Sequence, residues 1–139
     1  MTSELFSAIY NKALDILSRR EHSVLELKQK LKKKYEIEDD IEETISRLKK
    51  NNLLNDYRFS ESYVVYRKRK GFGPVKISKE LESKGVAEVI IFEVLDNEGG
   101  WVEAANKAFS KRFKEGPSTD TKTLLKQKNF LYNRGFDFK

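Results

Sequence analysis

The chain has 139 residues, of which 36% are charged and only 38% are hydrophobic, and its formal net charge is +6. This apolar fraction is lean for one compact core, and the positive charge favours contact with nucleic acid or with an acidic protein surface. The absence of cysteine excludes disulfides and thiolate metal sites, and no apolar run approaches the length of a membrane span, so we expect a soluble, cytoplasmic protein.

The sequence repeats itself three times at a constant offset of 50 residues. The clearest matches are Ile9, Phe59 and Phe109; Ala13, Tyr63 and Phe113; Leu31, Leu81 and Leu131; and Lys34, Lys84 and Arg134. A constant offset of this kind indicates one supersecondary unit copied in tandem. Because such units bury their apolar faces against neighbours and share one extended surface, we expect function in a long curved face rather than in a catalytic pocket.

The apolar spacing predicts an all-α fold: an elongated tandem array of three-helix repeats over residues 1–54, 55–100 and 101–139. In the first repeat, Ser23 and Glu26 form a capping box that opens the second helix. The expected apolar stripes of the three helices are Leu5, Ile9 and Ala13; Val24, Leu27, Leu31 and Tyr35; and Ile41, Ile45 and Leu48.

The second repeat, residues 55–100, has clearer boundaries. Asp56 is predicted to cap its first helix, and the inner face of that helix is predicted to be Phe59, Tyr63 and Tyr66. Pro74 suits the first position of the second helix, and Gly85 is the expected left-handed residue that ends it. A third helix is predicted near residues 89–95.

The third repeat, residues 101–139, begins with a helix from Trp101 to about Lys114. A second helix is predicted from a cap among Ser118, Thr119 and Asp120 to Gly135. The sequence stops where a third helix should begin, so we expect this repeat to lack most of its last helix.

The sign of the charge alternates along the chain. The net charge is +4 over residues 1–35, −4 over 36–66, +5 over 67–84, −5 over 85–103 and +6 over 104–139. The alternation follows the repeat, so that in each unit a basic segment comes first and an acidic segment follows. Two compatible explanations are open: opposite faces pair between neighbouring units, or the basic segments form a nucleic-acid footprint.

The sequence gives little support to enzymatic chemistry. His22, the only histidine, is interpreted as a turn residue beside a helix start rather than a catalytic base. The acidic cluster at residues 38–43 lacks the spacing of a calcium loop and is interpreted as a solvated helix N-terminus. Gly71 and Gly73 lack the rest of a phosphate-loop pattern. We therefore predict a non-enzymatic protein with no catalytic residues, metal, cofactor or small-molecule substrate.

Basic residues gather at the same corner of the first two repeats. Residues 67–70 are all basic and close a predicted helix, and Arg19 and Arg20 occupy the corresponding place in the first repeat. Each cation at a helix C-terminus is favourable by about 0.3 to 1 kcal/mol, but four in succession exceed that preference. We predict a track that binds DNA phosphates independently of sequence and is weakened by salt. The candidate binding residues are Arg19, Arg20, Lys30, Lys33, Arg67, Lys68, Arg69, Lys70, Lys76 and Lys79.

The run LLNDYRFSESYVVYRKRKGFGPVKISKELESKGV, residues 53–86, resembles the signature of the RecX family, regulators of the bacterial RecA recombinase. The segments LSRREHSVLELKQKL, residues 17–31, and FLYNRGF, residues 130–136, resemble the same family. The resemblance implies tandem three-helix repeats that lie in the groove of the RecA–DNA filament, bridge protomers, and suppress ATP hydrolysis, strand exchange and coprotease activity.

The resemblance also implies roles for individual residues. It makes Arg67, Arg69, Lys70 and Lys76 the better binding candidates. The residues that it marks as structural are Asp56, Arg58 and Phe59, which cap and pack a helix, and Gly73, Pro74 and Gly85. Two alternatives are open: a sequence-independent DNA-binding regulator, and a helical scaffold that recognises a peptide and keeps its binding at high salt. A helix-turn-helix reader of bases is disfavoured, because the predicted third helices are acidic or apolar.

Overall fold

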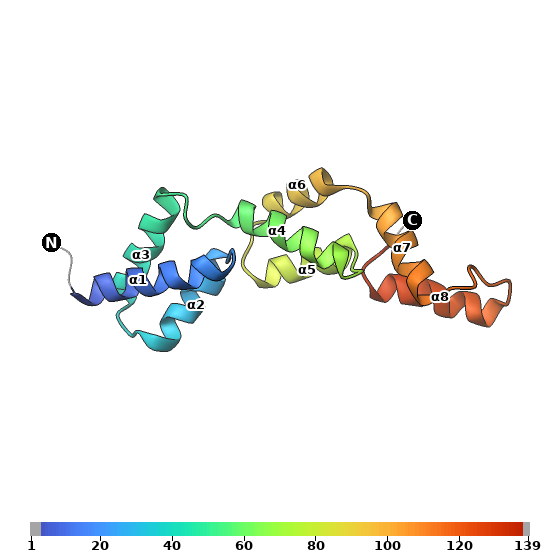
Figure 1. The fold of residues 1–139 in the computed structure, drawn as a ribbon, viewed down its shortest axis with the longest axis horizontal. Coiled ribbons are helices and arrows are strands. Elements are labelled where there is room, and N and C mark those ends of the chain that lie inside the picture. Colours follow the sequence, from blue (N-terminus) through green and yellow to red (C-terminus); the bar gives the residue numbers. More distant parts are fainter. Residues whose placement is uncertain (1–3, 138–139) are drawn as a thin grey trace.

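The structure is a computed structural model that describes residues 4–137, and this part of the chain forms eight α-helices and no strand. The helices are α1 (Glu4–Arg19), α2 (Val24–Lys34), α3 (Glu38–Lys50), α4 (Asp56–Arg69), α5 (Pro74–Ser83), α6 (Glu88–Glu98), α7 (Trp101–Arg112) and α8 (Thr121–Asn133). Figure 1 shows an elongated array in which α1–α3, then α4–α6, then α7 and α8 follow one another along the long axis. The predicted all-α tandem array is confirmed. None of these helices is both long enough and apolar enough to cross a bilayer.

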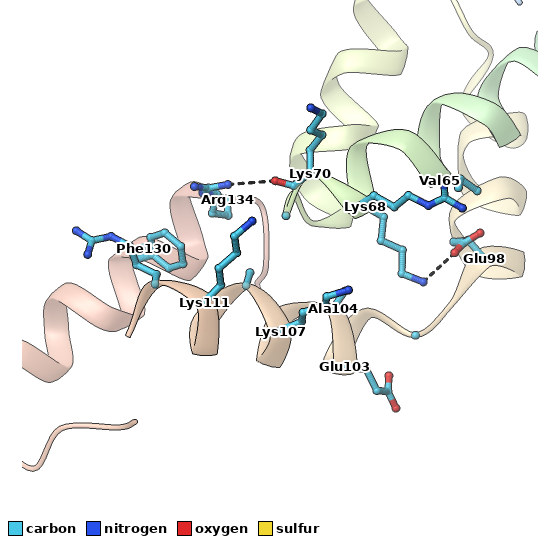
Figure 2. A pocket seen from close by; sticks show the side chains of 15 residues that line it. Val65, Lys68, Lys70, Glu98, Glu103, Ala104, Lys107, Lys111, Phe130 and Arg134 are labelled. Carbon is cyan, nitrogen blue, oxygen red and sulfur yellow. Dashed lines mark hydrogen bonds and ion pairs between the residues drawn. The ribbon is translucent and has the colours of Figure 1, made fainter. Parts of the chain in front are cut away.

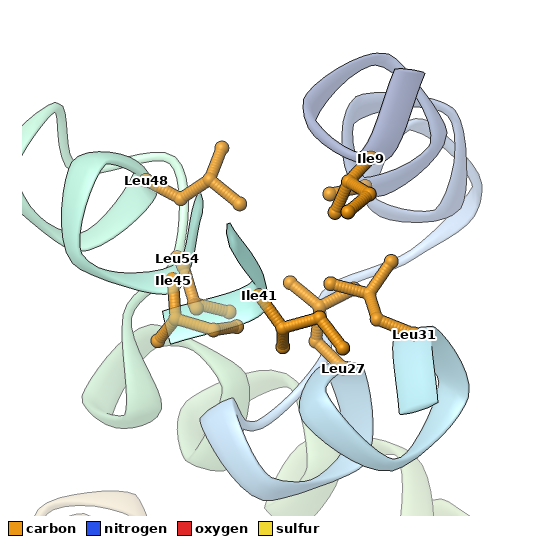
Figure 3. Close-up of a cluster of buried hydrophobic side chains, with 8 residues drawn as sticks. Ile9, Leu27, Leu31, Ile41, Ile45, Leu48 and Leu54 are labelled. Carbon is orange, nitrogen blue, oxygen red and sulfur yellow. The ribbon is translucent and has the colours of Figure 1, made fainter. Parts of the chain in front are cut away.

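Each three-helix unit has a hydrophobic core of its own. In the first unit, side chains from α1, α2 and α3 point toward one another (Figure 3); the buried ones are Ile9, Ala13, Leu27, Leu31, Ile41, Ile45, Leu48 and Leu54. In the second unit, the corresponding cluster is Phe59, Val64, Ile77, Leu81, Val86, Ile91 and Val94. The two clusters share no residue, as expected of stacked units that each bury a separate apolar face.

Local sequence signals set most of the helix ends as predicted. Ser23 and Glu26 form the capping box that begins α2, and Pro74 is the first residue of α5. Gly85 has a φ of +80° just after α5, and Asp120 caps α8 by accepting a hydrogen bond from the backbone N–H of Thr123 at 3.0 Å. Within residues 101–137 the third unit contains only α7 and α8.

The prediction that Asp56 caps its own helix is wrong. Asn55 is the N-cap of α4, and its side-chain oxygen accepts a hydrogen bond from the backbone N–H of Arg58 at 3.0 Å. The carboxylate of Asp56 instead accepts a hydrogen bond from the backbone N–H of Val24 at 2.8 Å. Asp56 therefore stabilises the start of α2, a helix of the preceding unit.

The predicted inner face of α4 is partly wrong. Phe59 is buried and Tyr63 is half-buried, but Tyr66 is 55% exposed. The buried residues of α4 are Phe59, Ser60 and Val64, which lie on the side of the helix turned toward α5 and α6. Each residue advances about 100° around a helix, so Tyr66 lies at the edge of the side formed by these buried residues.

Replacing Asp56 with alanine is expected to lower the free energy of unfolding by about 1 kcal/mol, because the start of α2 loses a hydrogen-bond acceptor. Asp56→Asn keeps a side-chain oxygen and should lose less. Urea unfolding followed by circular dichroism measures both variants. Equal stability of Asp56→Ala and the unchanged protein would contradict the contact with Val24.

Polar contacts join the first two units. Arg58 Nε donates to Glu21 Oε1 at 2.7 Å, and Lys84 Nζ donates to Glu26 Oε2 at 3.2 Å. Leu25 packs against Gly85, where an added Cβ would lie 2.9 Å from the Leu25 Cβ. Opposite charges therefore pair across this junction, which supports the first of the two explanations for the alternating charge.

Glu26 is the centre of the ion pairs at this junction. Its carboxylate accepts hydrogen bonds from Arg20 at 3.2 and 3.3 Å, from the backbone N–H of Ser23 at 3.1 Å and from Lys84. Desolvation by burial, the largest single influence, acts to raise the pKa of Glu26, but these donors together lower it to about 2.

Glu26→Gln is expected to lower the free energy of unfolding by roughly 2 kcal/mol at pH 7. The pKa of Glu26 is lower in the folded protein than the ordinary value of 4.5, so its stabilising contribution is complete above about pH 4.5 and is lost as the pH falls toward 2. Urea unfolding of both proteins between pH 2 and 7 should show the difference shrinking in acid. A difference independent of pH would contradict this role.

Backbone contacts join the second and third units. The N–H of Gly73 donates to the carbonyl of Arg134 at 2.7 Å, and the N–H of Val75 donates to the carbonyl of Gly135 at 3.0 Å. An added Cβ on Gly73 would lie 2.5 Å from the Gly135 oxygen, which is closer than real Cβ contacts. Two glycines thus let the end of α8 press directly against the start of α5.

Candidate functional site

A cleft of about 820 Å³ lies between the second and third units. One side is the C-terminal end of α4, and the other side is α7 together with the end of α8 (Figure 2). Gly99 and Gly100, with φ of +57° and +68°, turn the chain between α6 and α7. The backbone contact at Gly135 fixes the end of α8. The turn at Gly99 and Gly100 and the contact at Gly135 therefore set the position of the third unit and so form the cleft.

Basic side chains dominate the lining of this cleft. They are Lys68, Arg69, Lys70, Lys107, Lys111, Arg112 and Arg134, and the only acidic residues beside them are Glu98 and Glu103. The apolar part of the lining comes from Val65, Ala104, Ala108 and Phe130. The arrangement is a cationic cleft with some apolar lining, which suits a ligand that carries several negative charges.

Two of these basic side chains, Lys68 and Arg134, form contacts between the elements that border the cleft. Lys68 Nζ donates to Glu98 Oε2 and to the Gly99 carbonyl, both at 2.8 Å. The Arg134 guanidinium lies over the rings of Phe72 and Phe130, at 5.1 and 5.0 Å from their centroids. These contacts hold the end of α6 and the end of α8 against the C-terminal end of α4.

Four other basic residues in the lining form no ion pair within residues 4–137, so their charges can contact a ligand. Lys107 and Lys111 are exposed, four residues apart on α7, and neither forms an ion pair with any residue of the range 4–137. Arg69 and Lys70 are exposed on the facing end of α4 and are likewise without an acidic partner there. Side chains from two helices can therefore contact the same chain of phosphates from opposite sides.

The structure separates the basic residues that the sequence placed in one track. Lys68, Arg69 and Lys70 line the cleft, but Arg67 turns away and donates to Glu80 at 2.9 and 2.8 Å. These hydrogen bonds, together with the charge of Glu80, raise the pKa of Arg67. Lys79 is exposed on α5, and Lys76 lies over the ring of Phe72 at 5.1 Å. None of these last three residues lines the cleft.

The candidate residues of the first unit lie outside the cleft. Arg19 pairs with Asp15 at 3.5 Å, and Arg20 pairs with Glu26. Lys30 and Lys33 flank a shallow hollow on α2 together with Lys32. The first unit therefore has a separate, smaller basic surface, and its corner arginines are bound to acidic neighbours.

His22 lies in the turn before α2, as predicted, and is buried there, with 1% of its surface exposed. Its Nδ1 lies 3.0 Å from the Arg20 carbonyl and its Nε2 lies 2.7 Å from Lys30 Nζ. Burial, the largest influence, lowers the pKa of His22, so the neutral ring donates through Nδ1 and accepts from Lys30 through Nε2. The histidine thus holds Lys30 against the α1–α2 turn.

The other residues that the family resemblance marks as structural lie at contacts within and between units. Arg58 also donates to the Asn52 carbonyl at 2.9 Å, and Phe59 belongs to the core of the second unit. Gly73 and Pro74 meet the third unit, and Gly85 meets the first.

Lys107, Lys111, Arg112 and Arg134 line the cleft but are not among the binding residues predicted from the sequence. A signal was present, because Lys107 and Lys111 are four apart in a predicted helix and Arg134 is in register with Lys84. What the sequence does not give is the turn at Gly99 and Gly100, which places α7 opposite the end of α4.

The chain matches two family models, described as the first and second three-helix domains of RecX, over residues 10–48 and 55–95. It is 37% identical to a regulatory protein RecX of Legionella pneumophila (strain Corby), over 92% of this chain and 86% of that protein. The chain belongs to the RecX family. A RecX protein of Halorhodospira halophila (strain DSM 244 / SL1) is 38% identical, over 93% of this chain and 81% of its own length.

Two solved structures share the fold. The crystal structure of RecX from Lactobacillus salivarius aligns with a TM-score of 0.77 and 26% identity, over 96% of this chain and 89% of that one. A crystal structure of a regulatory protein RecX aligns with a TM-score of 0.79 and 24% identity, over 95% and 67% of the two chains. The matches to the two RecX domain models end at residue 95, so α7 and its lysines lie beyond them.

Proposed function

We propose that this protein binds in the groove of the RecA–DNA filament and inhibits the recombinase: its ATP hydrolysis, its strand exchange and its SOS coprotease activity. The protein would thereby modulate DNA repair and recombination in the cytoplasm. The observation that supports the proposal best is a cationic cleft between two units of an elongated RecX-family array. RecA as the partner follows from the family resemblance.

The cleft suits DNA phosphates better than bases. Its available cations are lysine and arginine side chains on helix surfaces, which contact phosphates whatever the sequence. The apolar side chains in the lining, Ala104, Ala108 and Phe130, offer no hydrogen-bonding groups for base edges. This chemistry agrees with a regulator that acts anywhere along a filament.

The acidic third helices argue against a reader of the major groove. In α3, Glu38 pairs with Lys32, Glu42 with Lys28 and Glu43 with Arg47. A recognition helix would have to place these carboxylates, or those of α6, against DNA phosphates.

A second candidate function is a regulator that binds DNA without the recombinase. The cationic cleft favours this function too, because its cations can bind DNA phosphates whether or not the recombinase is present.

ATP turnover by an assembled recombinase filament separates the two functions. Adding the protein to filaments on single-stranded DNA should inhibit turnover at about one molecule per protomer or fewer. The matched measurement is binding of the protein to the same DNA without recombinase. Unchanged turnover together with retained DNA binding would overturn the leading proposal and leave the second function.

A further inference from the structure

Helix α6 exposes an apolar face that no part of the described chain covers. Phe92 is 70% exposed and Val89 is 66% exposed, whereas Ile91 and Val94 on the other side of the helix are buried in the core of the second unit. Positions 89 and 92 are three apart, so the two exposed side chains lie together on one face. An exposed phenylalanine beside a valine on a rigid helix resembles the aromatic anchor of a protein interface.

Carboxylates without partners surround this face. Glu88 and Asp96 lie four residues before and after Phe92, and Glu93 lies four residues after Val89. None of these three carboxylates forms an ion pair or a hydrogen bond within residues 4–137. Of the five acidic residues at 38–43 on α3, by contrast, three are paired with lysine or arginine.

The negative charge of this face favours a protein partner over nucleic acid or anionic lipid. Nucleic acid and anionic lipid would both be repelled by three unpaired carboxylates around the apolar centre. A protein surface with an apolar depression rimmed by lysine or arginine would bury Phe92 and pair with the carboxylates at once. The surface therefore differs in kind from the cationic cleft.

We propose that the α6 face, formed by Glu88, Val89, Phe92, Glu93 and Asp96, docks on the recombinase protein while the cleft holds the DNA. This inference rests on the proposed function and assigns its two contacts to different surfaces. The recombinase surface at the contact would have an apolar depression with a basic rim.

The two surfaces are close enough to act together. Glu98, the last residue of α6, lines the cleft and pairs with Lys68 there. Phe92 precedes Glu98 by six residues, which corresponds to roughly 9 Å along a helix that rises 1.5 Å per residue. A protein bound to α6 would thus lie beside DNA held in the cleft, as it would in a filament of protein wound on DNA.

The test compares a double variant, Phe92→Ser with Glu93→Lys, with the unchanged full chain. Because both side chains are exposed, the variant should keep its helical circular dichroism. Fluorescence anisotropy with labelled single-stranded DNA should give an affinity within about threefold of the unchanged protein. Affinity for the assembled recombinase filament should fall by about tenfold or more.

The matched control is Leu125→Ser with Glu82→Lys. Leu125 and Glu82 are also exposed, on α8 and α5, and this variant makes the same change in charge and a similar loss of apolar surface. It should bind both DNA and filament as the unchanged protein does. An equal loss of filament affinity in the control would overturn the assignment to α6.

Three further outcomes are distinguishable. If the unchanged protein binds the filament and the α6 variant binds it equally well, the inference fails and the proposed function stands. If the unchanged protein does not bind the filament, the proposed function fails and this inference fails with it. If sedimentation shows the unchanged protein associating with itself through a contact that the variant lacks, the face binds a second copy and the inference is wrong.

Discussion

Replacing Gly135 with alanine is expected to separate the third unit from the second and to lower the free energy of unfolding by about 2 to 4 kcal/mol. Gly135 has a φ of +98°, and an added Cβ would lie 2.6 Å from both the backbone nitrogen and the Cβ of Lys76. The backbone must therefore shift, and the hydrogen bonds from Gly73 and Val75 to the carbonyls of Arg134 and Gly135 are lost.

Gly116→Ala is the control for this prediction. Gly116 has a similar φ of +83°, but an added Cβ there meets nothing within 4 Å, so the cost is limited to backbone strain of about 1 kcal/mol. Trp101, the single tryptophan, reports on the junction because its indole N–H donates to the Leu95 carbonyl at 3.0 Å. Urea unfolding followed by its fluorescence compares the variants, and equal destabilisation would contradict a steric role for Gly135.

Reversing the charge of the cleft in Lys107→Glu with Lys111→Glu is expected to weaken binding to single-stranded DNA by about tenfold to a hundredfold at low salt. Two phosphate contacts are lost and two repulsive charges are added. The slope of log affinity against log salt concentration should become shallower by roughly 1.4, at about 0.7 for each lost contact. Fluorescence anisotropy over a range of salt concentrations measures both quantities.

The matched variant Lys49→Glu with Lys50→Glu makes the same change in net charge at the end of α3. Both lysines are exposed there and lie outside the cleft. This variant should keep most of its affinity and its salt slope. If it weakens binding as much as the α7 variant does, the net charge of the protein governs binding and the cleft does not.

Helix boundaries were predictable where their causes are local. The Ser23–Glu26 capping box, Pro74 and Gly85 all act within a turn or two of their own position, so their effect can be derived from a short stretch of sequence. Asp56 was misassigned because two residues suited to capping stand side by side, and the contact that decides between them lies 32 residues away at Val24.

The basic residues at the end of α4 were predicted as part of the candidate site, but the directions of their side chains and the facing lysines of α7 were not. Four consecutive basic residues look like one patch in the sequence, but each step of about 100° around α4 points its side chain in a new direction. Arg67 thus reaches Glu80 and Lys68 reaches Glu98, which leaves Arg69 and Lys70 for a ligand. The facing lysines of α7 depend on the tertiary placement of that helix.

The two junctions of the array differ in chemistry, and so in how strongly dissolved salt acts on them. The ion pairs of Arg58 and Lys84 with the first unit have partly exposed side chains, so dissolved ions screen them. The glycine contact between the later units consists of direct main-chain bonds with no room for sliding. High salt should therefore weaken the polar contacts of the first junction more than the main-chain hydrogen bonds of the second.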